Sequence, residues 1–333
     1  MSDTTLPSLK PSPRRATSPL RSRALRARVS HALAVLFGVS LLTFLVAHAT
    51  GDPVTLLLPA NAPEATRIAL AHHLGLDQPL PVQYGLFLLH ALQGDFGRSF
   101  LYGQPVAPLV LQTLPATLEL AAAAFCIALL VGLPLGVLSA SRGGVASAAL
   151  QLLSMLGLAM PAFWLGLMLV LVFAVQLHLL PVDSSGGVSH LVLPALTLSL
   201  LSLARISRLV RSGMQEILDR DFIRTARARG LPEWRVVWVH GLRNVLVPVV
   251  TMAGMELGDL LSSAVVVEVV FAWPGIGRLS VEALGARDFP LLQGTVFIAG
   301  LGFVLINLLA DILCARIDPR IASGATSSGS IAP

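Results

Sequence analysis

Long apolar runs separated by shorter polar segments form the main pattern along the chain. The first run covers 29–50 without a formal charge, and five more apolar runs follow at about 116–140, 150–177, 191–210, 245–271 and 291–315. About 20 helical residues, at ~1.5 Å each, cross a ~30 Å hydrocarbon layer. The runs lack the alternation of barrel strands, and every backbone polar group in lipid needs an internal partner. The pattern therefore predicts an all-α polytopic membrane protein with six transmembrane helices.

Composition supports a membrane environment. Charged residues make up 12% of the chain and hydrophobic residues 55%, whereas a soluble protein carries about 25% charged residues. The net charge of +5 would be compatible with nucleic-acid binding. However, the arginines cluster in the segments between apolar runs, as in a membrane protein whose orientation is set by its basic loops. Cys126 and Cys314 both lie in apolar runs, which favours packing over a disulfide or a metal site.

The arginine distribution predicts that both termini are cytoplasmic. Nine arginines lie in 205–243, whereas 51–112 holds two and is expected to be a periplasmic loop. Residues 1–28 are predicted to be a disordered basic cytoplasmic tail and 316–333 a second cytoplasmic tail. An alternative for the run 29–50 is a cleaved signal peptide, because Ala47-His-Ala49 resembles a cleavage site. The length of the run and the spans that follow favour an uncleaved anchor.

A short basic helix is predicted inside the polar segment 211–244. Asp221 can cap its start, 222–229 contains no helix breaker, and Gly230 supplies a left-handed stop with Pro232 beyond. The residues expected to form its small apolar face are Phe222, Ile223 and Ala226. Local ion pairs are predicted at Glu216–Arg220 and Asp221–Arg224. One interpretation is a solvated loop that only fixes topology; the other is a docking helix whose interleaved small residues approach a groove on a cytosolic partner.

The segment 221–232, followed by 240–248, resembles the coupling loop of ABC importer permeases of the dipeptide/oligopeptide/nickel transport family, first-permease type. Arg224-Thr-Ala226 occupies the place of that loop's usual Glu-Ala-Ala, and the later proline is displaced to Pro248. Further resembling segments follow in order along the chain: GDFGRS at 94–99, LPATLEL at 114–120, PAFWLG at 161–166, LPALTL at 193–198, VVVE at 265–268, FAWPGIGR at 271–278 and DPR at 318–320.

The resemblance implies a type-I ABC importer transmembrane fold, with a first helix followed by a core over 113–311. It implies a permease subunit that forms half of a translocation pathway for peptides or related small solutes across the bacterial inner membrane. The implied partners are a second homologous permease, giving a heterodimer, two cytosolic ABC ATPases, and a periplasmic or lipid-anchored substrate-binding protein. The residues implied to couple to the ATPases are Arg224, Thr225, Ala226, Arg227, Ala228, Arg229 and Gly230.

The chain itself is not expected to hold a cofactor or to catalyse a reaction. It contains no Gly-x-x-x-x-Gly-Lys-Ser/Thr loop, so ATP and magnesium are expected on the partner ATPases. None of the eight histidines forms a His-x-x-x-His pair, and the adjacent His72 and His73 do not suit a shared metal. A secondary transporter or channel working without an ATPase is the main alternative function, and an intramembrane enzyme is a second one. No convincing internal repeat supports the former and no catalytic motif supports the latter.

Acidic residues in the fifth apolar run are candidates for the translocation pathway. Glu256 and Asp259 are three apart and share a helical face. A charged residue in the membrane centre costs at least ~2.5 kcal/mol on insertion scales, and the family pattern has neutral residues near both positions. They are therefore expected to favour a cationic group such as a peptide amino group. Alternatively, they lie at a water-filled interface or pair with an arginine of the second permease.

An acid and two glycine pairs in the apolar runs lead to two further predictions. Glu268, at the outer end of the fifth run, is a tentative gate residue, although a structural role at the helix terminus is favoured. Small-residue spacings at Gly132/Gly136 and Gly254/Gly258 predict close helix contacts.

Overall fold

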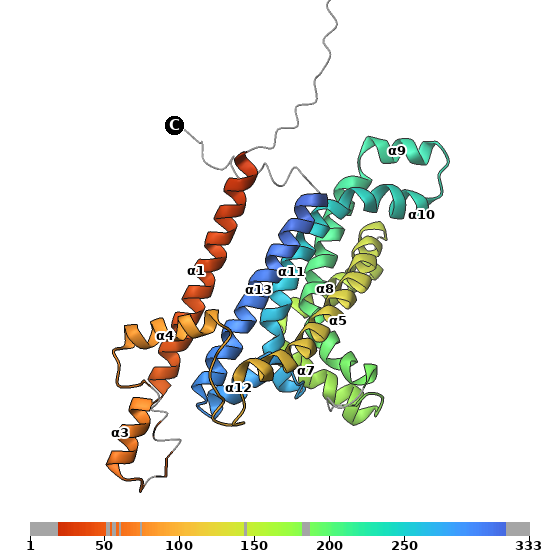
Figure 1. Ribbon diagram of the computed structural model, residues 1–333. Helices are drawn as coiled ribbons and strands as arrows, with labels where there is room; N and C mark the ends of the chain where they lie inside the picture. Colours follow the sequence, from red (N-terminus) through yellow and green to blue (C-terminus); the bar gives the residue numbers. More distant parts are fainter. Residues whose placement is uncertain are drawn as a thin grey trace, which may run out of the picture.

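A computed structural model describes residues 19–50, 54, 58–59, 61–73, 75–142, 145–181 and 187–317 (Figure 1). These residues are mostly helical, and the isolated β-bridge among them joins Arg98 and Pro105. The long helices are α1 (Pro19–Thr50), α5 (Val106–Ser141), α8 (Val188–Leu218), α11 (Leu242–Val270) and α13 (Phe289–Ile317). Shorter elements connect them: α3 (Glu64–His73), α4 (Leu80–Leu92), α6 (Val145–Ala159), α7 (Ala162–Leu169), the π-helix η1 (Val170–Gln176), α9 (Asp221–Ala228), α10 (Glu233–Arg235), the π-helix η2 (Val236–Gly241) and α12 (Ile276–Gly285).

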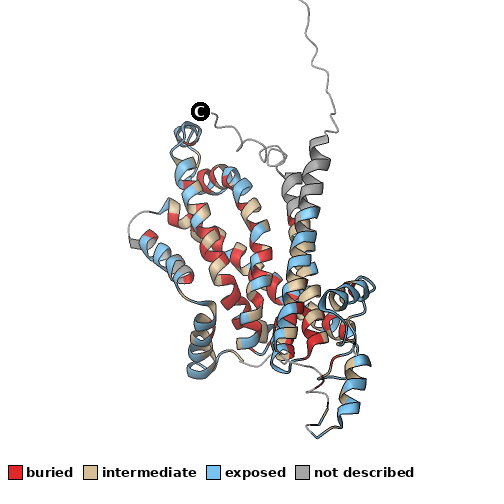
Figure 2. Cartoon of the chain, turned by 90° about the vertical axis from the view of Figure 1, so that its left-hand side faces the viewer, coloured by how far each residue is buried: buried red, intermediate tan, exposed pale blue. Residues whose placement is uncertain are grey.

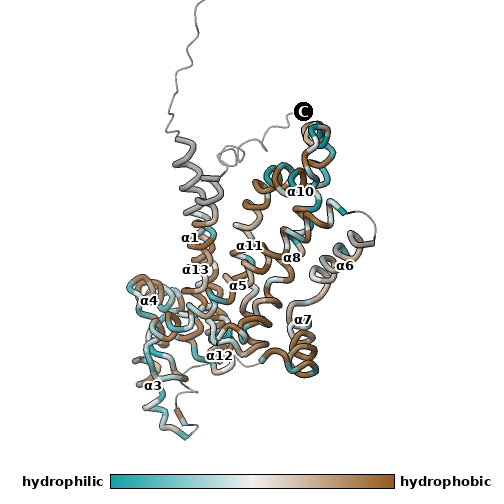
Figure 3. Tube along the Cα trace, turned by 90° about the vertical axis from the view of Figure 1, so that its right-hand side faces the viewer, coloured by the Kyte–Doolittle hydropathy of each residue, from teal (hydrophilic) through white to brown (hydrophobic). Residues whose placement is uncertain are grey.

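Four helical segments in the described part of the chain are long and apolar enough to cross a membrane. They are Val106–Ser141, Val188–Leu218, Glu233–Val270 and Phe289–Ala310. In Figure 1 they lie side by side as a bundle, and Figure 2 shows the buried residues gathered inside it. Figure 3 shows hydrophobic residues along the bundle, with hydrophilic ones at α10 and in α3. The structure therefore confirms the helical class and these four apolar helices.

Helix α8 lies at the centre of the bundle, where glycines of α5 let it approach closely. A Cβ on Gly136 would lie 2.6 Å from Val210 Cβ and 2.7 Å from the Ser207 carbonyl oxygen. A Cβ on Gly132 would lie 3.1 Å from the Leu203 carbonyl oxygen. The close contact predicted for this glycine pair is confirmed. A Cβ at Gly136 would require α8 to move, whereas one at Gly132 would require a shift of a few tenths of an ångström.

The third predicted span is not one helix. Helix α6 ends at Ala159, Met160 is not helical, and α7 begins after Pro161 and continues into η1. Proline lacks an N–H and pushes the preceding residue out of the helical region. The prediction of one continuous helix over 150–177 is therefore wrong, because hydropathy alone does not register the break.

The N-terminal helix begins earlier than predicted. Residues 19–28 belong to α1, so their predicted disorder is wrong, while 1–18 and 318–333 lie outside the described residues. Proline is accepted in a first helical turn, and the Leu, Ala and Arg residues that follow are good helix formers. The predicted loop 51–112 also contains helices: α4 contacts α1 through Tyr84 and Ser40, whose hydroxyl oxygens lie 2.8 Å apart, and through Gln83 Oε1 and His48 Nε2, 2.9 Å apart.

Two other helices are also longer than predicted. Helix α5 starts at Val106 rather than near 116, and α8 runs on to Leu218, inside the segment 211–244 expected to be a loop. Hydropathy measures suitability for lipid, whereas a helix can continue through polar residues beyond the apolar part. As a result α8 reaches the end of the bundle where α9 lies (Figure 1).

Candidate functional site

The short basic helix predicted from the sequence is present as α9, with the bounds Asp221–Ala228. Arg220 takes the N-cap position, and Asp221 lies in the first turn, where a negative charge interacts favourably with the helix dipole. Gly230 follows with φ = 75°, the left-handed conformation that ends helices. The prediction of Asp221 as the cap is off by one residue, while the predicted stop at Gly230 is confirmed.

One face of α9 packs against the rest of the polypeptide. Ile223 is fully buried and Ala226 nearly so, and both belong to one hydrophobic cluster with Val236 of η2. Phe222 was expected to share this face, but it is 45% exposed, because consecutive helical residues point about 100° apart. The apolar face is therefore narrower than predicted, and Phe222 projects to the outside.

Ion pairs fix the ends of α9. The predicted pairs are present, with Arg220 2.5 Å from Glu216 and Arg224 3.6 Å from Asp221. A further pair was not predicted: Arg227 donates from Nε and Nη2 to the two carboxylate oxygens of Glu233, at 3.1 and 2.7 Å. This two-point contact joins α9 to α10 across Gly230, and it raises the pKa of Arg227. Helix α9 is thus attached by packing at one face and by a fork-shaped contact at its end.

The remaining face of α9 points away from the bundle. The exposed residues of α9 and the turn after it are Asp221, Phe222, Arg224, Thr225, Arg227, Ala228, Arg229 and Gly230. Arginines outnumber acidic residues here, and Figure 1 shows α9 projecting at one end of the bundle. The geometry presents an exposed positive helix on a fixed base.

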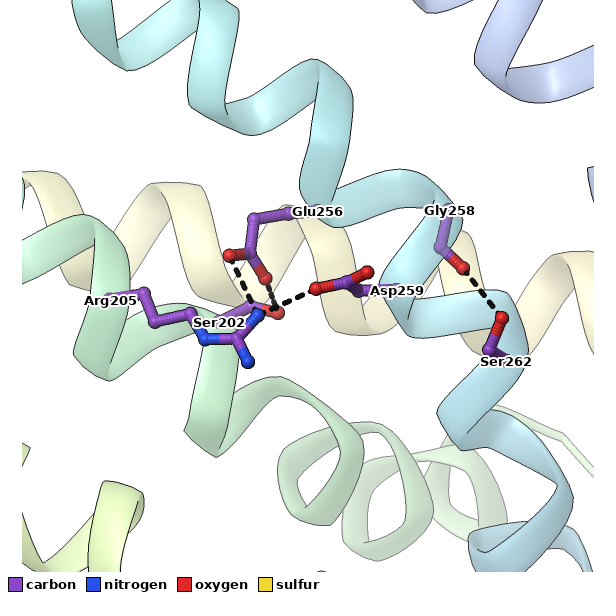
Figure 4. A network of polar contacts seen from close by, with 6 residues as sticks. All are labelled: Ser202, Arg205, Glu256, Gly258, Asp259 and Ser262. Carbon is purple, nitrogen blue, oxygen red and sulfur yellow. Dashed lines mark hydrogen bonds and ion pairs between the residues drawn. The ribbon is translucent and has the colours of Figure 1, made fainter. Parts of the chain in front are cut away.

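A second cluster lies inside the bundle, where α8 faces α11 (Figure 4). Glu256 is 3% exposed and accepts hydrogen bonds from Ser202 Oγ at 2.5 Å and from Arg205 Nη1 at 3.2 Å. Arg205 also donates to Asp259 Oδ2 at 2.7 Å. Both acids therefore share one arginine of their own chain. The sequence analysis counted Arg205 with the basic segment 205–243, whereas in the structure it lies within α8 and faces α11.

This cluster lines a cavity of ≈ 250 Å³. Its walls come from the α6–α7 break at Met160 and Pro161, from α8, and from the acidic face of α11. The side chain of Asp259 is 61% exposed, whereas that of Glu256 is 4% exposed. Among the groups that line it, one arginine and two carboxylates give a formal charge of −1. Asp259 is the more accessible acid in this cavity.

Sequence reasoning missed Ser202 and Arg205 although a signal was present. These residues are three apart on α8, the spacing that Glu256 and Asp259 have on α11. Two such pairs can meet when their helices pack side by side. Which helices pack together depends on contacts between residues more than fifty positions apart, and the spacing along one helix does not show this.

Glu268 lies elsewhere, about 18 Å further along α11 from Glu256 at the helical rise. It is fully buried, accepts a 2.6 Å hydrogen bond from Thr117 Oγ1, and accepts a 3.0 Å bond from the backbone N–H of Arg278. A Cβ on Gly275 would lie 2.3 Å from its carboxylate. Glu268 thus joins α5, α11 and the first turn of α12, where backbone N–H groups need acceptors.

A buried acid outside the predicted set fixes the loop 94–105. Asp288, immediately before α13, is fully buried and accepts hydrogen bonds from Ser99 Oγ at 2.5 Å and from the Leu101 N–H at 2.9 Å. Tyr102 of the same loop donates to Glu282 of α12 at 3.1 Å. These partners are about 180 residues apart in sequence, so no local pattern could reveal them. They give the end of the bundle opposite α9 a defined surface.

Groups of three or more potential metal-ligating side chains are absent from the described residues. His72 lies 3.9 Å from Asp77 in an exposed pair. The described geometry thus offers one ion-paired cluster around Arg205, two buried acids held by hydrogen bonds, and an exposed basic helix.

Comparisons with known proteins agree with this arrangement. Residues 132–323 match the model of the family described as binding-protein-dependent transport system inner membrane component, and residues 22–121 match its N-terminal counterpart. The chain is 40% identical to the probable D,D-dipeptide transport system permease protein DdpB of Escherichia coli strain K12, covering 90% of this chain and 97% of that protein. It is 39% identical to the oligopeptide transport system permease protein AppB of Bacillus subtilis strain 168, covering 88% and 97%. With the glutathione transport system permease protein GsiC of Salmonella choleraesuis it shares 40% identity over 85% and 93% of the two chains.

Solved structures show the same fold. A chain of the inward-facing MetNI methionine ABC transporter aligns with a TM-score of 0.52 and 20% identity, covering 63% of this chain and 96% of that one. In this family, separate subunits hydrolyse ATP. The chain belongs to the family of inner membrane components of binding-protein-dependent transport systems, and it is a permease subunit of an ABC importer.

Proposed function

We propose that this chain forms half of the translocation pathway of an importer for peptides or related small solutes. The relatives described above are named for a D,D-dipeptide, oligopeptides and glutathione, which are all peptides, and this supports the substrate class. The assembly comprises a second, homologous permease in a heterodimer, two cytosolic ATPases that bind ATP and magnesium, and a periplasmic or lipid-anchored binding protein.

The proposed topology has six spans and both termini in the cytoplasm. Four spans are the apolar helices of the bundle, and the other two are α1 and the broken unit α6–α7–η1. Helix α1 has 32 residues, or about 48 Å at the helical rise, so it is long enough to cross the hydrocarbon layer. The arginine-rich end with α9 faces the cytoplasm, because cations are retained on that side.

The observation that carries the proposal is the exposed, basic helix α9 on its fixed base. Residues 224–230 are assigned to coupling with the ATPases. We assign these residues different roles, because Ala226 packs inward with Ile223 and Arg227 pairs with Glu233. The surface that would bind in a groove on an ATPase consists of the exposed residues Phe222, Arg224, Thr225, Ala228 and Arg229.

Charge reversal at the outward arginines tests this assignment. In Arg224→Glu/Arg229→Glu, the ATPases should no longer co-purify with the permease and dipeptide uptake by cells should fall at least tenfold, while membrane insertion stays normal. Arg142→Glu is the matched control, because Arg142 is exposed in the turn between α5 and α6 and away from α9 in the sequence. Undiminished ATPase binding and uptake in the double variant would refute the docking role. Uptake by vesicles that lack any ATPase would favour the secondary transporter instead.

Within the pathway, we assign Glu256 and Asp259 to the surface past which solute moves. The cavity with its net charge of −1 and the accessible Asp259 carboxylate support a preference for cationic groups, such as a peptide amino group. Glu268 is assigned a structural role rather than a gating one, because its carboxylate is covered and occupied by the α5 and α12 partners.

A further inference from the structure

Two arginines of α8 line a small cavity that has no part in the proposed coupling or pathway. Arg208 and Arg211 are three residues apart and share a face of the helix. They border a cavity of ≈ 70 Å³ between α5, α6 and α8, whose walls include Ser139 of α5 and Gln151 of α6. A single water needs only about 10–15 Å³ on this measure, so the cavity admits a larger polar group. The described residues that line it include no acidic side chain.

These two arginines lack the carboxylate partners that other arginines in this region have. Arg205, Arg220 and Arg227 each form an ion pair. Within the described ranges, no ion pair involves Arg208 or Arg211, and the Arg211 Nε–H is buried without an acceptor. A buried donor without an acceptor is unfavourable, and two adjacent guanidinium groups repel each other. A group with several anionic oxygens would relieve both, since each guanidinium can donate two parallel hydrogen bonds to such oxygens.

The position of the cavity matches the depth of phospholipid headgroups. Helix α8 begins at Val188, and Arg208 lies 20 residues later, or about 30 Å along the helix, which equals the thickness of the hydrocarbon layer. Beside the cavity, α6 exposes apolar side chains: Leu152 is 60% exposed and Met155, which also lines the cavity, is 51% exposed. A polar hollow beside an exposed apolar strip suits a molecule with an anionic head and acyl chains.

We propose that Arg208 and Arg211 form a binding site for the phosphate group of an anionic phospholipid, at the end of the bundle that carries α9. Basic hollows between transmembrane helices are suited to such headgroups. The acyl chains lie along the exposed surface of α6. The site requires neither the coupling nor the pathway assignments to be correct.

The test uses the full chain purified in dodecyl maltoside and three additives. Dioleoylphosphatidylglycerol should remain bound in native mass spectrometry and raise the thermal unfolding midpoint. Dioleoylphosphatidylcholine has the same acyl chains without net charge and should do so at least tenfold more weakly. Sodium phosphate at matched concentration should not compete. Equal effects of the two lipids would overturn the proposal, and displacement of the lipid by phosphate would show a free-anion site instead.

Variants locate the site. Arg208→Gln and Arg211→Gln should each weaken phosphatidylglycerol binding about fivefold, as expected for removal of one cation near a headgroup, while Arg211→Lys should retain most of it. Arg220→Gln is the control, because it removes one charge from an exposed residue that Glu216 already pairs. Wild-type lipid affinity in the Arg208→Gln/Arg211→Gln chain would overturn the proposal. Loss of the second permease from that variant, with lipid binding unchanged, would show that the arginines meet a partner carboxylate.

Discussion

Replacement of Gly136 by alanine tests how closely α5 and α8 pack. The added Cβ would lie 2.6 Å from Val210 Cβ, 2.8 Å from Val210 Cγ1 and 2.7 Å from the Ser207 carbonyl oxygen. A rotamer change of the valine could move its Cγ1 atom, but its Cβ is fixed by the α8 backbone, to which the Ser207 carbonyl also belongs. The two helices must therefore move apart to admit the methyl group.

The expected cost follows from two opposing effects. Overpacking a tight contact costs about 1–3 kcal/mol, while replacing glycine by alanine within a helix gains up to about 1 kcal/mol. A net loss of roughly 0–2 kcal/mol in the free energy of unfolding is expected relative to the wild type, and about 1–3 kcal/mol relative to a glycine-to-alanine control without a clash. Gly302→Ala is the matched control: it lies in α13, no atom lies within 4 Å of the added Cβ, and only the favourable effect should appear.

The assay is unfolding of the full chain in mixed micelles with increasing sodium dodecyl sulfate, followed by circular dichroism. Val210→Ala in the Gly136→Ala background should recover little of the loss, because it removes the Cγ1 contact and leaves the closer contacts with the residue-210 Cβ and the Ser207 carbonyl oxygen. If Gly136→Ala were as stable as Gly302→Ala, the close helix contact would be incorrect and so would the explanation for this glycine.

Three other substitutions probe the polar contacts. Glu268→Ala should lower stability by about 2–4 kcal/mol, because it leaves buried donors without an acceptor, and the same unfolding assay checks this against Glu268→Gln. Asp259→Asn should reduce uptake of a dipeptide several-fold while sparing its N-acetylated form, because Arg205 then faces a neutral amide; equal effects on both peptides would contradict a cation preference. Glu233→Gln should change unfolding by less than about 1 kcal/mol, since its pair with Arg227 is exposed, yet lower ATPase co-purification, and unchanged co-purification would show that this contact does not position α9.

The sequence predicted best those features that neighbouring residues determine. Helix α9 is an example, because Asp221, Gly230 and Pro232 act within one or two turns of it. Gly132 and Gly136 also carried a local signal, and the structure shows the close approach. The break at Pro161 was visible as a proline but not in hydropathy, which stays high on both sides.

The features that sequence reasoning missed depend on contacts distant in the chain. Arg205 was assigned by its neighbours to a basic segment, yet its partners lie 51 and 54 residues away on α11. Asp288 contacts Ser99 across 189 residues. Hydropathy cannot predict such pairs. Helix packing, not spacing along one helix, determines which side chain pairs with an acid inside the bundle.

Helix α8 is continuous from the cavity to the base of α9, and this has a mechanical consequence. Thirteen residues separate Arg205 from Leu218, the last residue of α8, which corresponds to a lever of about 20 Å. A sideways push of a few ångströms on α9 therefore tilts α8 by several degrees. Such a tilt would first strain the close contact of Val210 with Gly136 of α5 and, further along α8, the Arg205 bridge to α11.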